Sequence, residues 1–290
     1  MAEDFPICIN LGLGHFTSAY ITHVNEVVTV ASVESSQEWK DFFLDTLPFK
    51  RSYEEKKKHA NQQCVEAAVS SALSSILQAT EEKLGLPVAI TVISYPSHFQ
   101  SSPYLSTLLR IAIKTYPEDL VTGYQVLLHL YSIKIAYSLN TSEAVGYGPG
   151  LDLDEYNSCS SMLTIRTKEL ADLKVRFKKL LDEQYQDNRC CQTHPEDFRF
   201  IIFSGEALPS EFLKIRDAVI EVVPAFSDKC RDEIDPHWVA AIGAAEQAKE
   251  YVLNPPVRRI GGMTEEGRKQ VEEQDDEFRR LRNEMMSLEG

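Results

Sequence analysis

The first residues that could do chemistry are glycines that follow an apolar segment near the start of the chain. Residues 7–11, ICINL, lead into Gly12 and Gly14, and Thr17 follows shortly after. A glycine turn after a strand lets backbone N–H groups come close to a phosphate. A dinucleotide-binding fingerprint would need a third glycine that opens a helix. Thr17 stands at that position and a second strand follows, so the pattern predicts a strand–turn–strand hairpin and excludes a Rossmann fold.

A second glycine turn follows the apolar segment 200–203. It contains Ser204, Gly205 and Glu206, and we take Gly205 and Glu206 as candidate ligand-binding residues. A nucleophile elbow of the G-x-S-x-G type would need a glycine two residues before the serine. Ile202 stands there instead, so the pattern does not support a serine hydrolase.

The spacing of the possible metal ligands does not fit a common metal site. Cys190 and Cys191 are adjacent and His194 lies nearby, whereas zinc sites usually separate their cysteines by a few residues and need a second ligand pair. Asp152 and Asp154 alternate along the chain and could share a cation, although solvated loop acids are the simpler interpretation. The sequence therefore predicts no metal site of its own.

Composition excludes several classes of function. The 290 residues include 30 basic and 44 acidic side chains, for a net charge of −14, so the phosphate backbone of a nucleic acid would be repelled. No apolar run is long enough to span a membrane, and the first residues lack the features of a secretory signal. Six scattered cysteines indicate reduced thiols rather than a disulfide framework. We therefore expect a cytoplasmic protein without nucleic-acid or membrane partners.

Hydrophobic spacing predicts an α/β protein. Valine-rich and glycine-punctuated segments at the start predict an antiparallel meander, with Asn25 at its second turn. A helical stripe of apolar residues ends at Gly85, a typical C-cap. The predicted strands are 5–11, 18–24, 26–33, 88–94, 161–166 and 200–203; the predicted helices are 61–84, 105–114, 125–139, 168–186, 210–223 and a last one that Asp235 and Pro236 begin and that runs to about 253.

Several segments, in chain order, resemble the ATPase domain of the 70-kDa heat-shock chaperone family, within the actin-like ATPase superfamily. The first hairpin resembles that family's first phosphate loop, the segment 200–212 its adenosine-side turn, and the Asp235-Pro236 segment its closing D-P-x-x-A-V-A-x-G-A-A helix. The segments that carry the resemblance are ICINLGLGHFTSAYI (7–21), ISYPSHFQ (93–100), HLYSIKIAYSLN (129–140), FIIFSGEALPSEF (200–212) and AIGAA (241–245).

The resemblance implies an actin-like fold of two lobes, each a mixed sheet flanked by helices, with reduced outer subdomains. The glycine-rich segment 146–150 is a plausible boundary, so we expect a first lobe at 1–140, a second at 141–254 and a charged tail at 255–290. It further implies a site for ATP or ADP with magnesium, to which Gly12, Gly14, Thr17, Gly205 and Glu206 would contribute.

The chain departs from the family where charge matters. Asn10 replaces the acidic residue of the first loop, and an amide cannot hold Mg²⁺ as a carboxylate does. His129 replaces the glutamate of the E-P-T helix. The second phosphate loop has no clear copy, since residues 154–162 lack its glycines. Because phosphoryl transfer depends on positioning and charge neutralisation, we expect absent or very slow turnover of ATP.

Three functions remain open at this point. The first is a pseudo-ATPase that acts through contact with a protein partner or client, as a scaffold or chaperone-like accessory. The second is an active chaperone-type ATPase in which Asp152, Asp154 or Glu206 substitutes for the lost acids. The third is a small-molecule enzyme that uses the altered cleft, with His15, His98 or His129 as acid–base groups.

Overall fold

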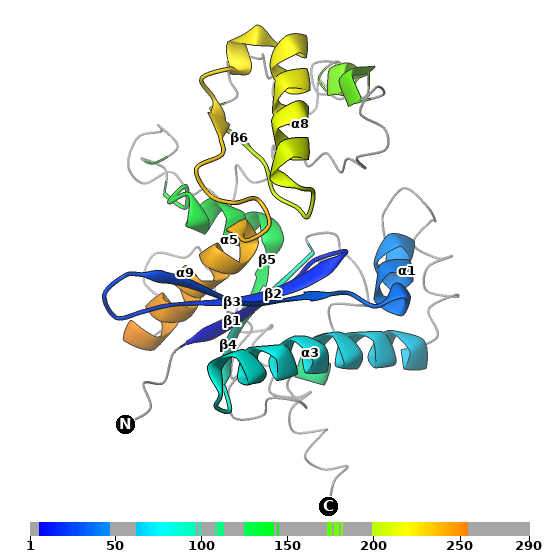
Figure 1. Ribbon diagram of the computed structural model, residues 1–290, viewed down its shortest axis with the longest axis vertical. Helices are drawn as coiled ribbons and strands as arrows, with labels where there is room; N and C mark the ends of the chain where they lie inside the picture. Colours follow the sequence, from blue (N-terminus) through cyan, green and yellow to red (C-terminus); the bar gives the residue numbers. More distant parts are fainter. Residues whose placement is uncertain are drawn as a thin grey trace, which may run out of the picture. The chain divides into compact units, whose positions relative to one another are not determined.

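The computed structural model describes residues 6–46, 62–96, 99, 108, 110–112, 125–141, 144, 173–175, 177–179, 181 and 199–254. The chain divides into two compact units (Figure 1). Unit 1 comprises Met1–Tyr137 and Ala240–Gly290, and unit 2 comprises Ser138–Val239. None of the helices within the described residues is both long and apolar enough to cross a membrane.

Unit 1 is built on a mixed sheet of five strands in the order β3-β2-β1-β4-β5. The first three strands form the predicted antiparallel meander, and β4 and β5 add to it in parallel with β1. Asn25, at the turn between β2 and β3, has a φ of 65°, the left-handed conformation that asparagine tolerates. The strands are β1 (Ile7–Leu11), β2 (His15–Ile21), β3 (Val27–Glu34), β4 (Ile90–Tyr95) and β5 (Val126–Leu128).

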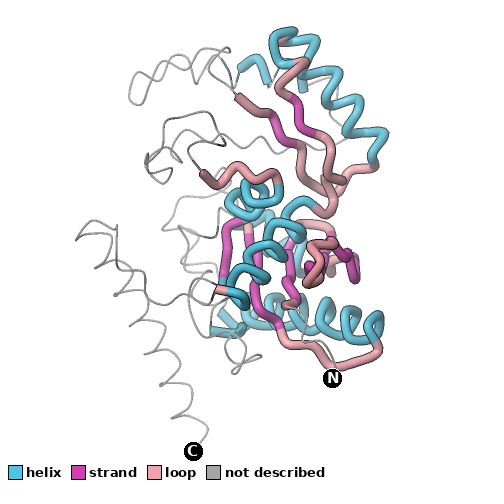
Figure 2. The backbone as a smooth tube through the Cα atoms, turned by 90° about the vertical axis from the view of Figure 1, so that its left-hand side faces the viewer, coloured by secondary structure: helices cyan, strands magenta, loops and turns pink. Residues whose placement is uncertain are grey.

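Helices cover both faces of this sheet, which explains why β1 is buried at every position. On one face lies α3 (Gln62–Leu84), where the Ser18 and Thr80 hydroxyls share a hydrogen bond of 2.7 Å. On the other face lies α9 (Val239–Leu253) (Figures 1 and 2). There the Cys8 thiol donates to the carbonyl oxygen of Ala241 at 2.9 Å. Burial raises the pKa of Cys8 to about 12, so its thiol stays protonated.

A short helix, α5 (His129–Ala136), packs directly against α9. A Cβ placed on Gly243 would lie 1.7 Å from the carbonyl oxygen of Ser132 and 3.0 Å from the backbone nitrogen of Ala136. Only glycine permits so close an approach of two helix backbones. The small residues of the predicted last helix therefore serve this contact.

Helix α1 (Gln37–Thr46) joins unit 1 beside an aromatic cluster. Trp39 is fully buried, and its ring lies 5.2 Å from that of Phe16, 5.5 Å from that of Phe42 and 6.3 Å from that of Phe99, measured between centroids. The sequence pattern predicted no helix here. Helix α1 contributes Trp39 and Phe42 to this cluster, and burial of their rings against Phe16 and Phe99 stabilises the helix.

Unit 2 has a smaller core. Two short parallel strands, β6 (Ile201–Ile202) and β7 (Cys230–Arg231), lie with α8 (Pro209–Val222) and the 3-10 helix η6 (Pro224–Phe226). Its buried apolar residues form two small clusters, and Leu208 and Leu213 of the α8 region stay 69% and 54% exposed. The buried residues of these two clusters are Leu173, Leu181, Phe203, Ile215, Ala218, Val219 and Phe226.

Three predicted elements are corrected. The second strand, expected at 18–24, spans His15–Ile21, and Thr17 lies inside it because it pairs with Asn10 of β1. The helix expected at 125–139 begins with β5, and only from His129 does the chain become helical. The last helix begins at Val239 and not at Pro236; a turn precedes it, in which the Asp235 carboxylate accepts from the backbone N–H of His237 at 3.0 Å. The segments 146–150 and 161–166 and the tail 255–290 lie outside the described residues.

The lobes expected at 1–140 and 141–254 stay a prediction. Within the two compact units, the first stretch of unit 1 ends at Tyr137, and residues 240–253 of helix α9 belong to the same unit. The physical reason is that the glycine and alanine face of α9 packs against α5 and β1.

Candidate functional site

A row of polar side chains crosses the sheet of unit 1 near the carboxyl ends of β1 and β4. Asn10 pairs with Thr17 on one side and with Ser94 on the other, so the three residues share one face of the sheet. All three are buried although none is apolar. Ligands of open α/β sheets bind at the carboxyl ends of parallel strands, which marks this row as the candidate site.

Asn10 is the central residue of this polar row. Its side-chain Nδ2 donates to the Thr17 hydroxyl at 3.2 Å, which fixes the amide plane. Its Oδ1 is buried and accepts no hydrogen bond from the described residues. A buried acceptor that is left unsatisfied costs about 1–3 kcal/mol, so this oxygen is suited to a water or a ligand group that donates.

Ser132 of helix α5 extends the polar row beyond Ser94 of β4. The Ser132 hydroxyl donates to the Ser94 hydroxyl at 3.0 Å, and Ser132 also lies 3.3 Å from the carbonyl oxygen of Leu128. Ser132 is the residue whose carbonyl oxygen contacts Gly243 of α9. The α5–α9 contact therefore fixes a side chain of the candidate site.

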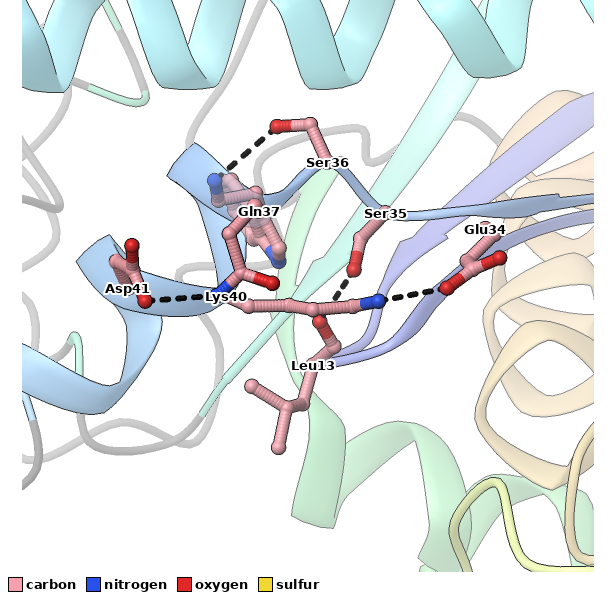
Figure 3. A network of polar contacts seen from close by, with 8 residues as sticks. Leu13, Glu34, Ser35, Ser36, Gln37, Lys40 and Asp41 are labelled. Carbon is pink, nitrogen blue, oxygen red and sulfur yellow. Dashed lines mark hydrogen bonds and ion pairs between the residues drawn. The ribbon is translucent and has the colours of Figure 1, made fainter.

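The glycine turn lies directly after β1. The backbone N–H of Gly12 donates to the carbonyl oxygen of His15 at 3.0 Å, as the predicted hairpin requires. The carbonyl oxygens of the turn are bound by the segment that enters α1. Trp39 Nε1 donates to the carbonyl oxygen of Gly12 at 2.7 Å, and the Ser35 N–H donates to that of Gly14 at 2.7 Å. The Ser35 hydroxyl donates to the carbonyl oxygen of Leu13 at 2.6 Å, a contact that Figure 3 shows.

Charged side chains lie beside this turn. Lys40 Nζ forms an ion pair of 2.7 Å with Glu34, and Figure 3 shows both near Leu13 and Ser35. The hydrogen bond from Lys40, together with its charge, lowers the pKa of Glu34 below its usual value. His15 pairs with Glu34 across β2 and β3, so this candidate acid–base group faces a carboxylate. The charges lie at the end of the hairpin and not within the polar row.

The second glycine turn belongs to unit 2. Gly205 has a φ of 147°, a conformation that side chains rarely adopt, and its N–H donates to the carbonyl oxygen of Pro236 at 3.1 Å. Its neighbour Glu206 is half-buried. Gly12, Gly14 and Thr17 thus form one group in unit 1, and Gly205 and Glu206 form another in unit 2.

Of the other candidate acid–base and metal-binding residues, His129 is described by the structure. His129 is the first residue of α5, after the carboxyl end of β5. His98, Asp152, Asp154, Cys190, Cys191 and His194 lie outside the described residues. Within the described ranges, no three histidine, cysteine, aspartate or glutamate side chains are grouped so that they could hold a metal ion.

Sequence reasoning did not identify four residues of this site: Ser35, Trp39, Ser94 and Ser132. Ser94 ends the mostly apolar segment VAITVIS, and Ser132 lies within HLYSIKIA. A serine in a buried segment is a usable signal because it must find a hydrogen-bond partner. Ser35 and Trp39 reach the turn through the fold alone, and no local pattern indicated them.

Comparisons with known proteins complete the description. No protein-family model matches the chain, and no curated protein matches it. Among solved structures, the chain is similar to the crystal structure of the Aquifex aeolicus member of the Ppx/GppA protein family. The alignment covers 85% of this chain and 89% of that chain, with 10% sequence identity and a TM-score of 0.24.

Proposed function

We propose that this chain is a degenerate, heat-shock-chaperone-like pseudo-ATPase of the actin-like class. It would hold a nucleotide without organising a metal ion, and it would act through contact with a protein partner rather than through phosphoryl transfer. The five-stranded mixed sheet with helices on both faces supports the fold part of this proposal. The chaperone part rests on the sequence segments that resemble that family.

The observation that carries the proposal is the chemistry of Asn10. It stands where the resemblance places the acid that organises the metal, and its neighbours in the row, Thr17 and Ser94, are also neutral. Neutral oxygens cannot offset the charge of Mg²⁺, which is normally held by carboxylates and phosphates. The residues present therefore suit a hydrogen-bonded ligand group better than a tightly held divalent ion.

ATP or ADP would meet two kinds of group in unit 1. The backbone of the Gly12–Gly14 turn would face the phosphates, and Asn10 Oδ1 would accept from a water or another donor bound with the ligand. Magnesium would arrive with the nucleotide and would be held by its phosphates and by water. Without an oriented charge on the protein side, transition-state stabilisation falls by several kcal/mol, about a hundredfold or more in rate.

Calorimetry with ATP tests the proposal in the presence of Mg²⁺ and then of EDTA. We expect the wild-type chain to bind ATP with dissociation constants that agree within about twofold in the two buffers, since Asn10 offers the metal no carboxylate. Phosphate release should stay at the level of the buffer. In Asn10→Asp, the new carboxylate should repel the phosphates in EDTA, and Mg²⁺ should improve the affinity by about tenfold or more.

The matched control is Asn140→Asp, which adds the same charge at an exposed position. It should leave the dissociation constant and its independence of Mg²⁺ unchanged. Magnesium-dependent hydrolysis of ATP by the wild-type chain would overturn the proposal in favour of an active ATPase. Absence of any nucleotide binding would overturn the nucleotide part and leave a scaffold without a ligand.

A further inference from the structure

We propose that Asn10 and Ser94 bind one O–H group between them, which in the free protein is that of a buried water. The group accepts a hydrogen bond from Ser94 and donates one to Asn10. The inference goes beyond the proposed function, because it concerns the free protein and holds whether or not a nucleotide binds. It gives Ser94, which the sequence pattern did not indicate, a binding role.

The two residues are neighbours on one face of the sheet. Asn10 of β1 pairs with Ser94 of β4 in parallel register, and paired residues of neighbouring strands direct their side chains to the same face. Asn10 is 7% exposed and Ser94 is 0% exposed. Both polar side chains are therefore removed from bulk water, and each must find its hydrogen-bond partners inside the protein.

The hydrogen bonds on either side of this pair run in the same direction. The Ser132 hydroxyl donates to Ser94 Oγ at 3.0 Å, and Asn10 Nδ2 donates to the Thr17 hydroxyl at 3.2 Å. A serine hydroxyl can donate its own proton while it accepts another, so Ser94 is able to donate. Asn10 Oδ1 accepts no hydrogen bond from the described residues. The polar row thus places a donor beside an acceptor that do not bond to each other.

The spacing of the two strands fits one bridging oxygen. Neighbouring strands lie about 4.8 Å apart. A water joins two polar atoms through two hydrogen bonds of about 2.8 Å each, so it bridges atoms that are too far apart to bond directly. Asn10 and Ser94 are adjacent in register, yet Oδ1 accepts nothing from Ser94, as such a bridge requires.

The two partners select the chemical class of the bound group. An ionised phosphate or carboxylate oxygen only accepts, so it would leave Asn10 Oδ1 without a donor. An ammonium group only donates, and a metal ion would face the Ser94 proton. A water or a hydroxyl group accepts and donates through a single oxygen. It also continues the direction of the row, in which each hydrogen bond polarises the next.

A crystal structure of the free protein, at a resolution that shows ordered waters, tests the inference directly. We expect one water within about 3.2 Å of both Asn10 Oδ1 and Ser94 Oγ. Crystals grown with MnCl2 should give no anomalous signal at this position. A manganese signal there, a direct hydrogen bond between the two side chains, or the absence of density between them would overturn the inference.

A double-mutant cycle measures the bridge in solution. Ser94→Ala removes the donor, and Asn10→Leu removes the acceptor while it keeps the size of the side chain. Each should lower the urea midpoint of unit 1, followed by the fluorescence of Trp39 in a Trp238→Phe background. In the double variant the second substitution should have a smaller effect than it has alone, because the bridge is already lost. We expect a coupling of about tenfold in the unfolding equilibrium constant.

The matched control is the pair Ile9 and Ile93, one position earlier in the same two strands. Both residues are apolar and fully buried, and they pair in the same register. Ile9→Val and Ile93→Val should couple by less than about twofold, since these side chains share no bridging group. Equal coupling in the two pairs would overturn the inference, because it would assign the effect to packing between neighbouring strands.

Failure of this inference is distinguishable from failure of the proposed function. If the water is present in the crystal and calorimetry detects no binding of ATP, the proposed nucleotide site fails and the O–H site stands. If ATP binds as proposed and no group bridges Asn10 and Ser94, this inference alone is wrong.

Discussion

Gly243 of unit 1 and Gly205 of unit 2 are glycines for different reasons. In unit 1, Gly243 has an ordinary helical backbone and no room for a side chain, because the α5 backbone lies against it. In unit 2, Gly205 has room, since a Cβ would lie 3.6 Å from the Phe212 ring, but its φ of 147° disfavours any side chain. Close packing therefore requires a glycine at position 243, whereas backbone conformation requires one at position 205.

This contrast extends to the cores. Unit 1 buries every residue of β1 between helices on both faces, whereas the strands of unit 2 are half-buried. A closely packed core transmits a change of one methyl group, while a loosely packed core absorbs it. Substitutions should therefore have larger effects in unit 1 than in unit 2.

Gly243→Ala should give the largest effect. The added methyl group would overlap the Ser132 carbonyl oxygen at 1.7 Å, and backbone atoms cannot move aside without separating α5 from α9. We expect a loss of about 4 kcal/mol or more in the free energy of unfolding of unit 1. Urea denaturation followed by Trp39 fluorescence, in a Trp238→Phe background, measures this unit alone.

Gly85→Ala is the matched control in unit 1. Gly85 ends α3 with a φ of 72° and has no atom within 4 Å of a built Cβ, so the loss should be only about 1 kcal/mol. Equal losses in the two variants would show that α5 and α9 do not pack as closely as the structure describes.

Gly205→Ala should give an intermediate effect, confined to unit 2. The methyl group fits beside Phe212, so only the backbone conformation is strained, at a cost of about 1–2 kcal/mol. Trp238, which lies in unit 2, reports this unit when Trp39 is replaced by Phe. A loss as large as that of Gly243→Ala would contradict the comparison, because it would mean that packing controls both glycines.

The sequence predicted the elements best where the signal was local. The apolar stripe of 61–84 matches α3 almost residue for residue, and Gly85 ends it in the left-handed conformation. Pro209 begins α8 as its ring geometry favours. These features depend on neighbouring residues only, so one sequence suffices to identify them.

The sequence did not predict features that depend on contacts between residues far apart in the chain. The apolar VLL of β5 cannot be distinguished from a helix start by periodicity, and pairing with β4 decides its conformation. Trp39 reaches Gly12 across 27 residues, and Ser132 reaches Ser94 across 38. The hairpin turn after β1 could thus be predicted, because its signal is local, whereas the side chains that donate hydrogen bonds near it could not.

The smallest effect should come from the ion pair at the end of the unit 1 hairpin. Lys40 lowers the pKa of Glu34, so the carboxylate stabilises the folded state above the pKa that this group has in the unfolded chain. That contribution disappears as the pH falls through the lower folded-state pKa. Replacing Glu34 by Gln should therefore slightly reduce the urea midpoint of unit 1 at pH 7 and leave it unchanged at a pH well below the pKa of an ordinary glutamate.

Glu34 is exposed, and surface ion pairs are screened by salt, so the difference at pH 7 should shrink as ionic strength rises. Lys40→Met should reproduce the loss, and the double variant should add nothing further. A midpoint difference between wild type and Glu34→Gln that persists at acidic pH would instead mean that the side chain matters through packing, and would extend the close-packed character of unit 1 to its surface.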